Sequence, residues 1–337
     1  MELALLFILS GVFMGWSVGT NDAANAFGTA VGTRVVKYRT AIWLCAVFAV
    51  LGAVVSGHKV IDSVGSYAVN NSITTGLAAF IVMLAATITV TGMTLIKVSV
   101  SSSQCLVGAI VGWGLSQGTA DWSKTSGFLS AWLISPVAAM VICFALCFFA
   151  ERFIEKRVKG LAAYDMVIKI GYIVSGIFAA YSLGANSAAN ATGIYLRVGV
   201  FDGPAQAVNR FLSALHIPFT VTVPLLAALI GGLSIALGVL TFSKRVMLTV
   251  GESITKLSPL TGFLVVLSCS VVIFFFSLIG YTISNSQAVI GAVMGAGFAK
   301  GVRSVDFKVL GRIFVAWFGT PTIAGVVCYL IGIVFFR

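Results

Sequence analysis

The chain has 337 residues, of which 59% are hydrophobic and only 9% are charged, and it carries a formal net charge of +11. A water-soluble fold of this size cannot bury that much apolar surface, so lipid must cover part of it. The Lys and Arg residues are scattered over short predicted loops without interleaved aromatic side chains, which argues against nucleic acid as a partner.

Long apolar stretches separated by short polar connections predict an all-α, polytopic membrane protein. A helix needs about 20 apolar residues to cross the hydrocarbon core of a bilayer. The first stretch has neither a basic segment nor a small-residue cleavage site, which favours a retained span over a cleaved signal peptide. In chain order, the predicted stretches are 3–20, 41–56, 76–96, 105–115, 128–149, 166–183, 217–242, 259–281, 288–298 and 311–335.

Two polar segments interrupt the apolar pattern of the first half. The first is Gly19-Thr-Asn-Asp-Ala-Ala-Asn-Ala-Phe-Gly28, which carries Asn21, Asp22 and Asn25 into the first span region. The second is Ser101-Ser-Ser-Gln104, which opens stretch 105–115. That stretch is too short to cross the core in full, so it predicts a half-helix.

The same segments recur in the same order after a charged connector. The first reappears as Gly184-Ala-Asn-Ser-Ala-Ala-Asn-Ala-Thr-Gly193 and the second as Ser284-Asn-Ser-Gln287. This predicts an N-terminal transmembrane repeat (1–150), a short basic connector (151–164) and a C-terminal repeat (165–337). An odd number of spans in each repeat inverts the second copy. Inverted repeats with a site at their interface are typical of secondary transporters.

The distribution of charge predicts the orientation. When the N terminus is placed outside, most of the 21 Lys and Arg residues fall on the inner side, together with the connector. The positive-inside rule therefore predicts a multi-pass protein of the cell membrane or inner membrane, with both termini outside.

Polar residues at membrane depth must face a cavity or one another, because lipid cannot satisfy them. Interhelical hydrogen bonds are one reading of the repeated Asn side chains. Asp22 favours the other reading, an ion or substrate pathway, because an ionisable residue inside a span seldom has a purely structural role.

The serine-rich segments offer a different chemistry. Ser and Asn are good N-caps, and the exposed N–H groups at a helix start bind an oxyanion without any Lys or Arg. Serine hydroxyls and glutamine amides can donate to a tetrahedral anion, whereas Asp22 and Asn carbonyl groups can coordinate a hard cation such as sodium. Helix capping alone is the alternative, and the two readings are compatible.

These duplicated segments resemble the inorganic phosphate transporter family, the sodium- or proton-coupled phosphate symporters. The resemblance covers both halves. It implies about 10–12 transmembrane helices, counting broken or re-entrant half-helices, and a site built from the paired motifs. One departure is Ser187, where the family often has Asp, so the paired motifs hold a single carboxylate.

The site predicted on this basis has two groups of residues. Those expected to bind phosphate are Asn25, Ser102, Ser103, Gln104, Asn190, Ser286 and Gln287. Those expected to bind sodium are Asn21, Asp22, Ser101, Asn186, Ser187, Ser284 and Asn285.

The leading functional hypothesis is sodium-coupled import of inorganic phosphate, with phosphate, sodium and the lipid bilayer as partners, a homodimer as a possible assembly and no cofactor. Proton coupling, or sulfate as the solute, is the alternative within the same fold. An anion channel and an intramembrane enzyme are alternatives of another class. The enzyme finds no support, since the chain has neither an HExxH nor a GxSxG motif.

Overall fold

A computed structural model describes residues 2–95, 100–157, 160–254, 258–301 and 307–336. All regular structure in these ranges is helical. In chain order the helices are α1 (Glu2–Gly32), α2 (Tyr38–Ser56), α3 (His58–Asn70), α4 (Gly76–Leu95), α5 (Ser102–Gln117), α6 (Trp122–Arg157), α7 (Leu161–Thr192), the 3-10 turn η1 (Gly193–Tyr195), α8 (Asp202–Ala214), α9 (Val223–Ile254), α10 (Pro259–Leu278), α11 (Asn285–Ala299) and α12 (Phe307–Phe336).

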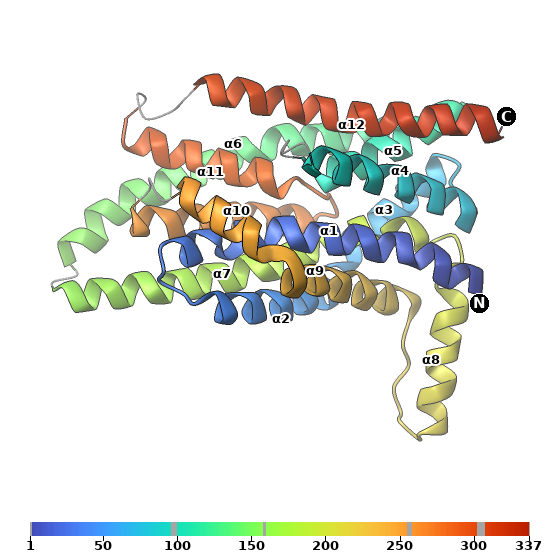
Figure 1. The fold of residues 1–337 in the computed structure, drawn as a ribbon, viewed down its shortest axis with the longest axis horizontal. Helices are drawn as coiled ribbons and strands as arrows, with labels where there is room; N and C mark the ends of the chain where they lie inside the picture. The colour runs from blue at the N-terminus through green and yellow to red at the C-terminus, as the bar shows by residue number, and fades with distance from the viewer. Residues whose placement is uncertain (1, 96–99, 158–159, 255–257, 302–306, 337) are drawn as a thin grey trace.

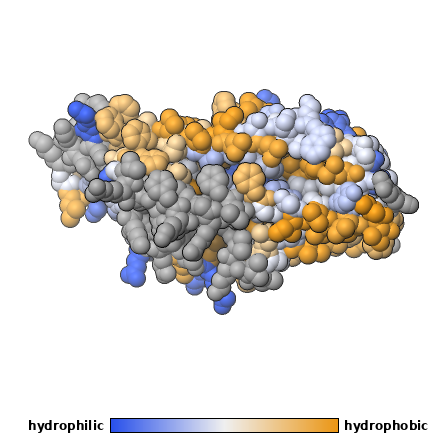
Figure 2. All heavy atoms as spheres, turned by 90° about the horizontal axis from the view of Figure 1, so that it is seen from above, coloured by the Kyte–Doolittle hydropathy of each residue, from blue (hydrophilic) through white to orange (hydrophobic). Residues whose placement is uncertain are grey.

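The long helices lie side by side along one direction, and both chain termini lie at the same end of the bundle (Figure 1). Within the described residues, eight helices are long and apolar enough to span a membrane. Apolar side chains gather in broad patches on the outer surface (Figure 2), and Leu133 and Val137 of α6 are examples that are more than half exposed. The prediction of an all-α, multi-pass membrane protein is confirmed.

The two helices that carry the Asn motifs are longer than predicted. The first predicted stretch ended at residue 20, but α1 continues through Asn21 and Asp22 to Gly32. The second, 166–183, lies within α7, which runs from Leu161 to Thr192. Both motifs are rich in alanine, the strongest helix former, so a polar segment that suggested the end of a span continues as helix.

The two serine-rich segments begin short, separate helices, as predicted. Ser101 is the N-cap of α5 and accepts a hydrogen bond from the backbone N–H of Gln104 at 3.3 Å. Ser284 is the N-cap of α11 and accepts from the N–H of Gln287, also at 3.3 Å. The 16 residues of α5 and the 15 of α11 are too few to cross a bilayer.

The predicted stretch 217–242 was wrong at its start, because the helix α9 begins only at Val223. The residues before it form α8, a short helix that the apolar pattern did not reveal, and a return segment. Pro218 disfavours helical backbone at Ile217, and Pro224 is tolerated only in the first turn of a helix. The two prolines therefore delay the start of α9.

The contacts between helices follow the same pattern when each helix is replaced by its counterpart in the other half. α1 packs along α9 while α7 packs along α2, and α5 packs against α12 while α11 packs against α6. α4 contacts α5 and α12, and α10 contacts α11 and α6. Two copies related by a pseudo-two-fold axis would produce this exchange, so the packing supports the two-repeat organisation. The inverted topology and the repeat boundaries themselves stay predictions.

Glycines let the short helices approach the long helices closely, and two of these glycines form an equivalent pair. A Cβ atom added at Gly108 of α5 would collide with the carbonyl oxygen of Pro321 in α12. At the equivalent Gly291 of α11, it would collide with the carbonyl oxygen of Pro136 in α6. Small residues at such contacts let backbones approach closely, which is how helices associate when lipid surrounds them.

We expect Gly108→Ala and Gly291→Ala each to destabilise the protein by about 1–3 kcal/mol, because backbone must move to admit the new methyl group. The measurement is thermal unfolding in detergent. Gly319→Ala in α12 is the matched control, since no atom lies within 4 Å of its added Cβ. Equal melting temperatures for all three variants would contradict the close approach.

Candidate functional site

The starts of α5 and α11 meet inside the bundle. The hydroxyl of Ser103, in the first turn of α5, donates to the carbonyl oxygen of Ile283 at 3.1 Å. The hydroxyl of Thr282 donates to Ser103 Oγ at 2.9 Å. The segment leading into α11 therefore lies directly against the first turn of α5. All three residues are buried.

The side chain of Asn186 in α7 is hydrogen-bonded to the segment before α11. Its Oδ1 accepts from the backbone N–H of Ile283 at 3.0 Å, and its Nδ2 donates to the carbonyl oxygen of the same residue at 2.9 Å. One amide side chain thus satisfies both backbone groups of a residue that belongs to no helix. Ile283 is fully buried, so these bonds replace those that its backbone would otherwise make to water.

The side chain of Asn190, one turn further along α7, is hydrogen-bonded to the start of α5. Its Nδ2 donates to Ser103 Oγ at 3.0 Å and to Ser102 Oγ at 3.3 Å. Its Oδ1 accepts from the hydroxyl of Thr282 at 3.2 Å. The result is a neutral cluster of amide and hydroxyl groups at the point where the two short helices begin.

Asp22 of α1 lies on the α11 side of this junction. Asn285, the first residue of α11, donates through Nδ2 to Asp22 Oδ2 at 2.7 Å and to the hydroxyl oxygen of Ser187 at 3.2 Å. A hydrogen bond to an ionised acceptor is stronger than one between neutral groups, so this bond is strongest when Asp22 is a carboxylate. The carboxylate is therefore tied to the start of one short helix.

A cavity of about 10 Å³ adjoins the Asp22 carboxylate. Its polar lining comes from Asp22, Asn25, Ser270 and Asn285. Asn285 Oδ1 is buried and has no hydrogen-bond partner among the described residues. A volume of this size holds about one water-sized sphere. The cavity therefore suits a single small ion and excludes a tetrahedral oxyanion.

Not every predicted site residue joins this cluster. Asn21 donates to the carbonyl oxygen of Ser17 in its own helix at 3.0 Å. Ser101 and Ser284 use their hydroxyl oxygens as helix caps, and Ser286 is partly exposed. Asn25, expected beside the anion, lines the small cavity next to Asp22 instead.

Gln104 and Gln287 lie together, but on the other side of the short helices. Both line a cavity of about 510 Å³ walled by apolar side chains of α6 and α12, among them Trp132 and Pro321. The Oε1 atom of each glutamine is buried without a partner among the described residues. The two glutamines therefore share one space, as symmetry suggested, but that space is apolar.

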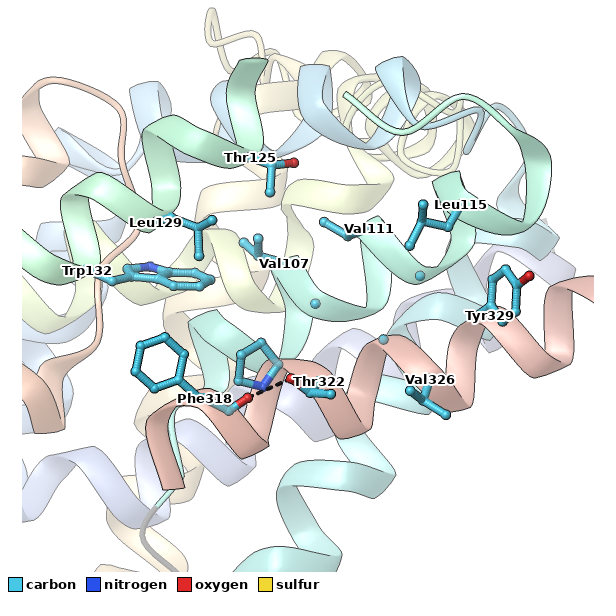
Figure 3. A pocket seen from close by; sticks show the side chains of 14 residues that line it. Val107, Val111, Leu115, Thr125, Leu129, Trp132, Phe318, Thr322, Val326 and Tyr329 are labelled. Atoms are coloured by element: carbon cyan, nitrogen blue, oxygen red, sulfur yellow. Dashed lines mark hydrogen bonds between the residues drawn. The ribbon is translucent and has the colours of Figure 1, made fainter. Parts of the chain in front are cut away.

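The neighbouring cavity, of about 550 Å³, is also apolar (Figure 3). Val107 and Val111 of α5 line it on one side and Val326 of α12 on another. Two of its hydroxyl groups are already engaged: Thr125 donates to the carbonyl oxygen of Asp121 at 2.5 Å and Thr322 to that of Phe318 at 2.8 Å. Size alone does not make this cavity a site for an oxyanion.

Three contributors were missed at the level of sequence. Thr282 and the backbone of Ile283 precede the second serine-rich segment, and nothing in their spacing marks them. Ser270 lies in the middle of the apolar helix α10. A serine there resembles any small residue at a helix contact, and only the fold places it next to Asp22.

Comparison with known proteins finds a matching family, related permeases and a solved structure with the same fold. Residues 18–328 match the sequence profile described as the phosphate transporter family. A Pyrococcus abyssi protein provisionally named a phosphate permease is 26% identical over 97% of this chain and 96% of its own length. A Bacillus subtilis sulfate permease is 28% identical over 100% of this chain and 89% of its own length. A solved structure, a sodium-dependent phosphate transporter, shares the fold with a TM-score of 0.79, 24% identity and 98% coverage of both chains.

Asn186→Ala should destabilise the protein, because it leaves the N–H group of Ile283 buried and unpaired and leaves its C=O group with the Ser103 hydroxyl as donor. The expected loss is about 1–3 kcal/mol for the orphaned N–H group. Thermal unfolding in sodium-free and phosphate-free buffer measures it. Asn21→Ala is the matched control, since Asn21 occupies the equivalent motif position but, among the described residues, bonds within its own helix. Indistinguishable melting temperatures would show that Asn186 does not hold the α11 start.

Proposed function

Since this chain belongs to the phosphate transporter family, a family of membrane transporters rather than enzymes, we propose that it is a sodium-coupled symporter that carries inorganic phosphate into the cell. The observation that carries the proposal is the buried junction of the α5 and α11 starts. A neutral donor cluster lies on one side of that junction and a single carboxylate on the other.

The anion side is the cluster formed by Ser102, Ser103 and Asn190. A helix start presents backbone N–H groups that its own residues cannot satisfy and a partial positive charge, and both favour an oxyanion. In the structure these side chains are hydrogen-bonded to one another and to Thr282. The proposal requires them to exchange these bonds for phosphate oxygens. Such an exchange keeps the number of hydrogen bonds nearly constant.

The cation side is the small cavity beside Asp22. A carboxylate, an amide carbonyl and a hydroxyl are the oxygen ligands that hard cations prefer. Asn285 Oδ1, buried without a partner among the described residues, is available as such a ligand. The proposal therefore places sodium among Asp22, Asn25, Ser270 and Asn285, and it moves Asn25 from the anion group to the cation group.

Charge couples the two sides. Phosphate and the Asp22 carboxylate are both negative, and bringing like charges together in a medium of low dielectric constant costs several kcal/mol. Sodium bound at Asp22 removes most of that repulsion. It also contacts Asn285, the residue that opens α11. Each solute therefore raises the affinity for the other, as linkage requires.

Sulfate is a second candidate solute, and the Bacillus subtilis relative favours it. Both anions are tetrahedral, but phosphate usually carries a proton and sulfate does not. A phosphate hydroxyl needs an acceptor, and Asn190 Oδ1, which accepts only from Thr282 among the described residues, could serve. A proton carried by Asp22 is likewise the alternative to sodium as the coupling ion.

The deciding experiment measures uptake into proteoliposomes. Labelled phosphate and labelled sulfate are offered separately, each under an imposed sodium gradient, a pH gradient or neither. We expect phosphate accumulation driven by sodium. Accumulation of sulfate alone, or accumulation driven only by pH, would transfer the proposal to the corresponding alternative.

We predict that Asp22→Asn lowers sodium-driven uptake about tenfold or more, because losing one hydrogen-bonded charge removes about 1.5–3 kcal/mol of stabilisation. The change preserves shape, so insertion should be normal. Asp202→Asn, which removes an exposed carboxylate of α8, is the control and should transport normally. Unaltered sodium dependence in Asp22→Asn would remove Asp22 from the ion site.

We further predict that Ser103→Ala and Asn190→Ala each raise the half-saturating phosphate concentration about tenfold, the equivalent of one lost hydrogen bond to a charged group. The half-saturating sodium concentration at saturating phosphate should change much less. Gln104→Ala and Gln287→Ala belong in the same series. A larger effect from the glutamines than from Ser103 and Asn190 would place the anion in the apolar cavity instead.

A further inference from the structure

The second half of the chain contains an arm that the first half lacks. Residues 33–37 are enough to join α1 to α2, whereas residues 193–222 lie between α7 and α9. Within that longer connection, α8 and the return segment 215–222 form the arm. The shared packing of the two halves does not require it, so its shape calls for another explanation.

The arm projects sideways from the bundle. In Figure 1, α8 runs crosswise to the long helices, at the end where the chain termini lie. The surroundings of Gly76, at the start of α4, agree with this position, because a Cβ atom added there would meet both Phe7 of α1 and Val200, just before α8. In the described structure α8 packs only weakly, and against α9.

Hydrogen bonds give the arm a defined shape. Asn209 Oδ1 accepts from the backbone N–H of Val221 at 2.7 Å, and its Nδ2 donates to the carbonyl oxygen of Val221 at 3.0 Å. At the far end, Ile217 N–H bonds to Leu212 C=O at 3.0 Å, and His216, with a φ of 54°, takes the left-handed conformation of a helix terminus. The return segment is therefore held against α8.

The two sides of α8 differ in polarity. With 100° between successive residues, Gln206, Arg210 and Ser213 fall on one arc of the helix. Phe211 and Leu215 fall on the opposite arc and are 64% and 54% exposed. On the return segment, Ile217 and Phe219 are also exposed, at 44% and 56%. Exposed apolar side chains that gather on one side of an element mark a surface for a membrane or a partner.

We propose that the arm lies in the boundary between lipid headgroups and acyl chains, with Phe211 and Leu215 directed into the acyl region. Short helices that are apolar on one side and polar on the other occupy this layer, parallel to the membrane surface. The crosswise direction of α8 is parallel to that surface, since the spans run across the membrane. Arg210, on the polar arc, lies at the level of the lipid phosphates.

Connectivity supports lipid as the occupant. The return segment leads without a break into α9, one of the membrane-spanning helices. The apolar surface of the arm therefore continues the lipid-facing surface of the bundle. It extends the contact between protein and bilayer outward at the level where the spans end.

Spin labels test the depth of the arm. Phe211→Cys reports on the apolar arc, and its neighbour Arg210→Cys is the matched control on the polar arc. The six native cysteines are all buried, so a thiol-specific label reacts with the introduced one. The labelled proteins are reconstituted into vesicles of phosphatidylethanolamine and phosphatidylglycerol. Collisions with oxygen, which partitions into lipid, are compared with collisions with a water-soluble nickel chelate.

We expect the oxygen-to-nickel collision ratio to be severalfold higher at position 211 than at position 210. Leu215→Cys should behave like Phe211→Cys, which guards against a local effect of either substitution. Equal ratios at 210 and 211 would mean that the arm stands in water. A label at 211 shielded from both reagents, with spectral broadening caused by a second label nearby, would mean that another copy of the chain covers it. Either result would overturn the proposal.

Discussion

A buried polar group is costly unless it has a hydrogen-bond partner, and the junction at the centre of this molecule is arranged around that requirement. Two short helices begin in the middle of the bundle, where their N-cap residues are buried. The side chains of Asn186 and Asn190 on α7 meet the need by bonding to backbone and hydroxyl groups at both starts. The groups that form these hydrogen bonds include those to which the proposed function assigns solute binding.

The difference between Asp22 and Ser187 gives the two sides of the junction different polarity. Asp22 on α1 and Ser187 on α7 occupy equivalent positions of the repeated motif, and both lie next to Asn285. Two carboxylates here would repel each other and any anion, whereas none would leave nothing to attract a cation. With one carboxylate, the α11 side differs in charge from the neutral α5 side. The proposed binding of a cation and an anion within one cluster rests on that difference.

The two halves share the contacts by which their short and long helices pack together. Gly108 and Gly291 sit in equivalent contacts against Pro321 and Pro136, because each half supplies the surface that the other must fit. A change in one half would disturb the partner contact in the other. The arm at α8 is not subject to this constraint, because it projects from the bundle and does not have to fit a surface of the other half.

Composition and the repeated motifs determined by themselves that this is an all-helical membrane protein, that its halves correspond and that two serine-capped helices are too short to cross the bilayer. These are local or statistical properties, and residues close together in the chain carry them. Tertiary structure decided which polar groups meet. The paired bonds of Asn186 to Ile283, the place of Ser270 beside Asp22 and the separation of Gln104 from the Asn190 cluster all depend on how distant helices are rotated about their axes. The helix α8 was also found only in the structure, because its short apolar arc is a weaker sequence signal than the long apolar stretches of the spans. Helix rotation is set by the simultaneous packing of many side chains from both halves, and no single segment of the sequence contains that information.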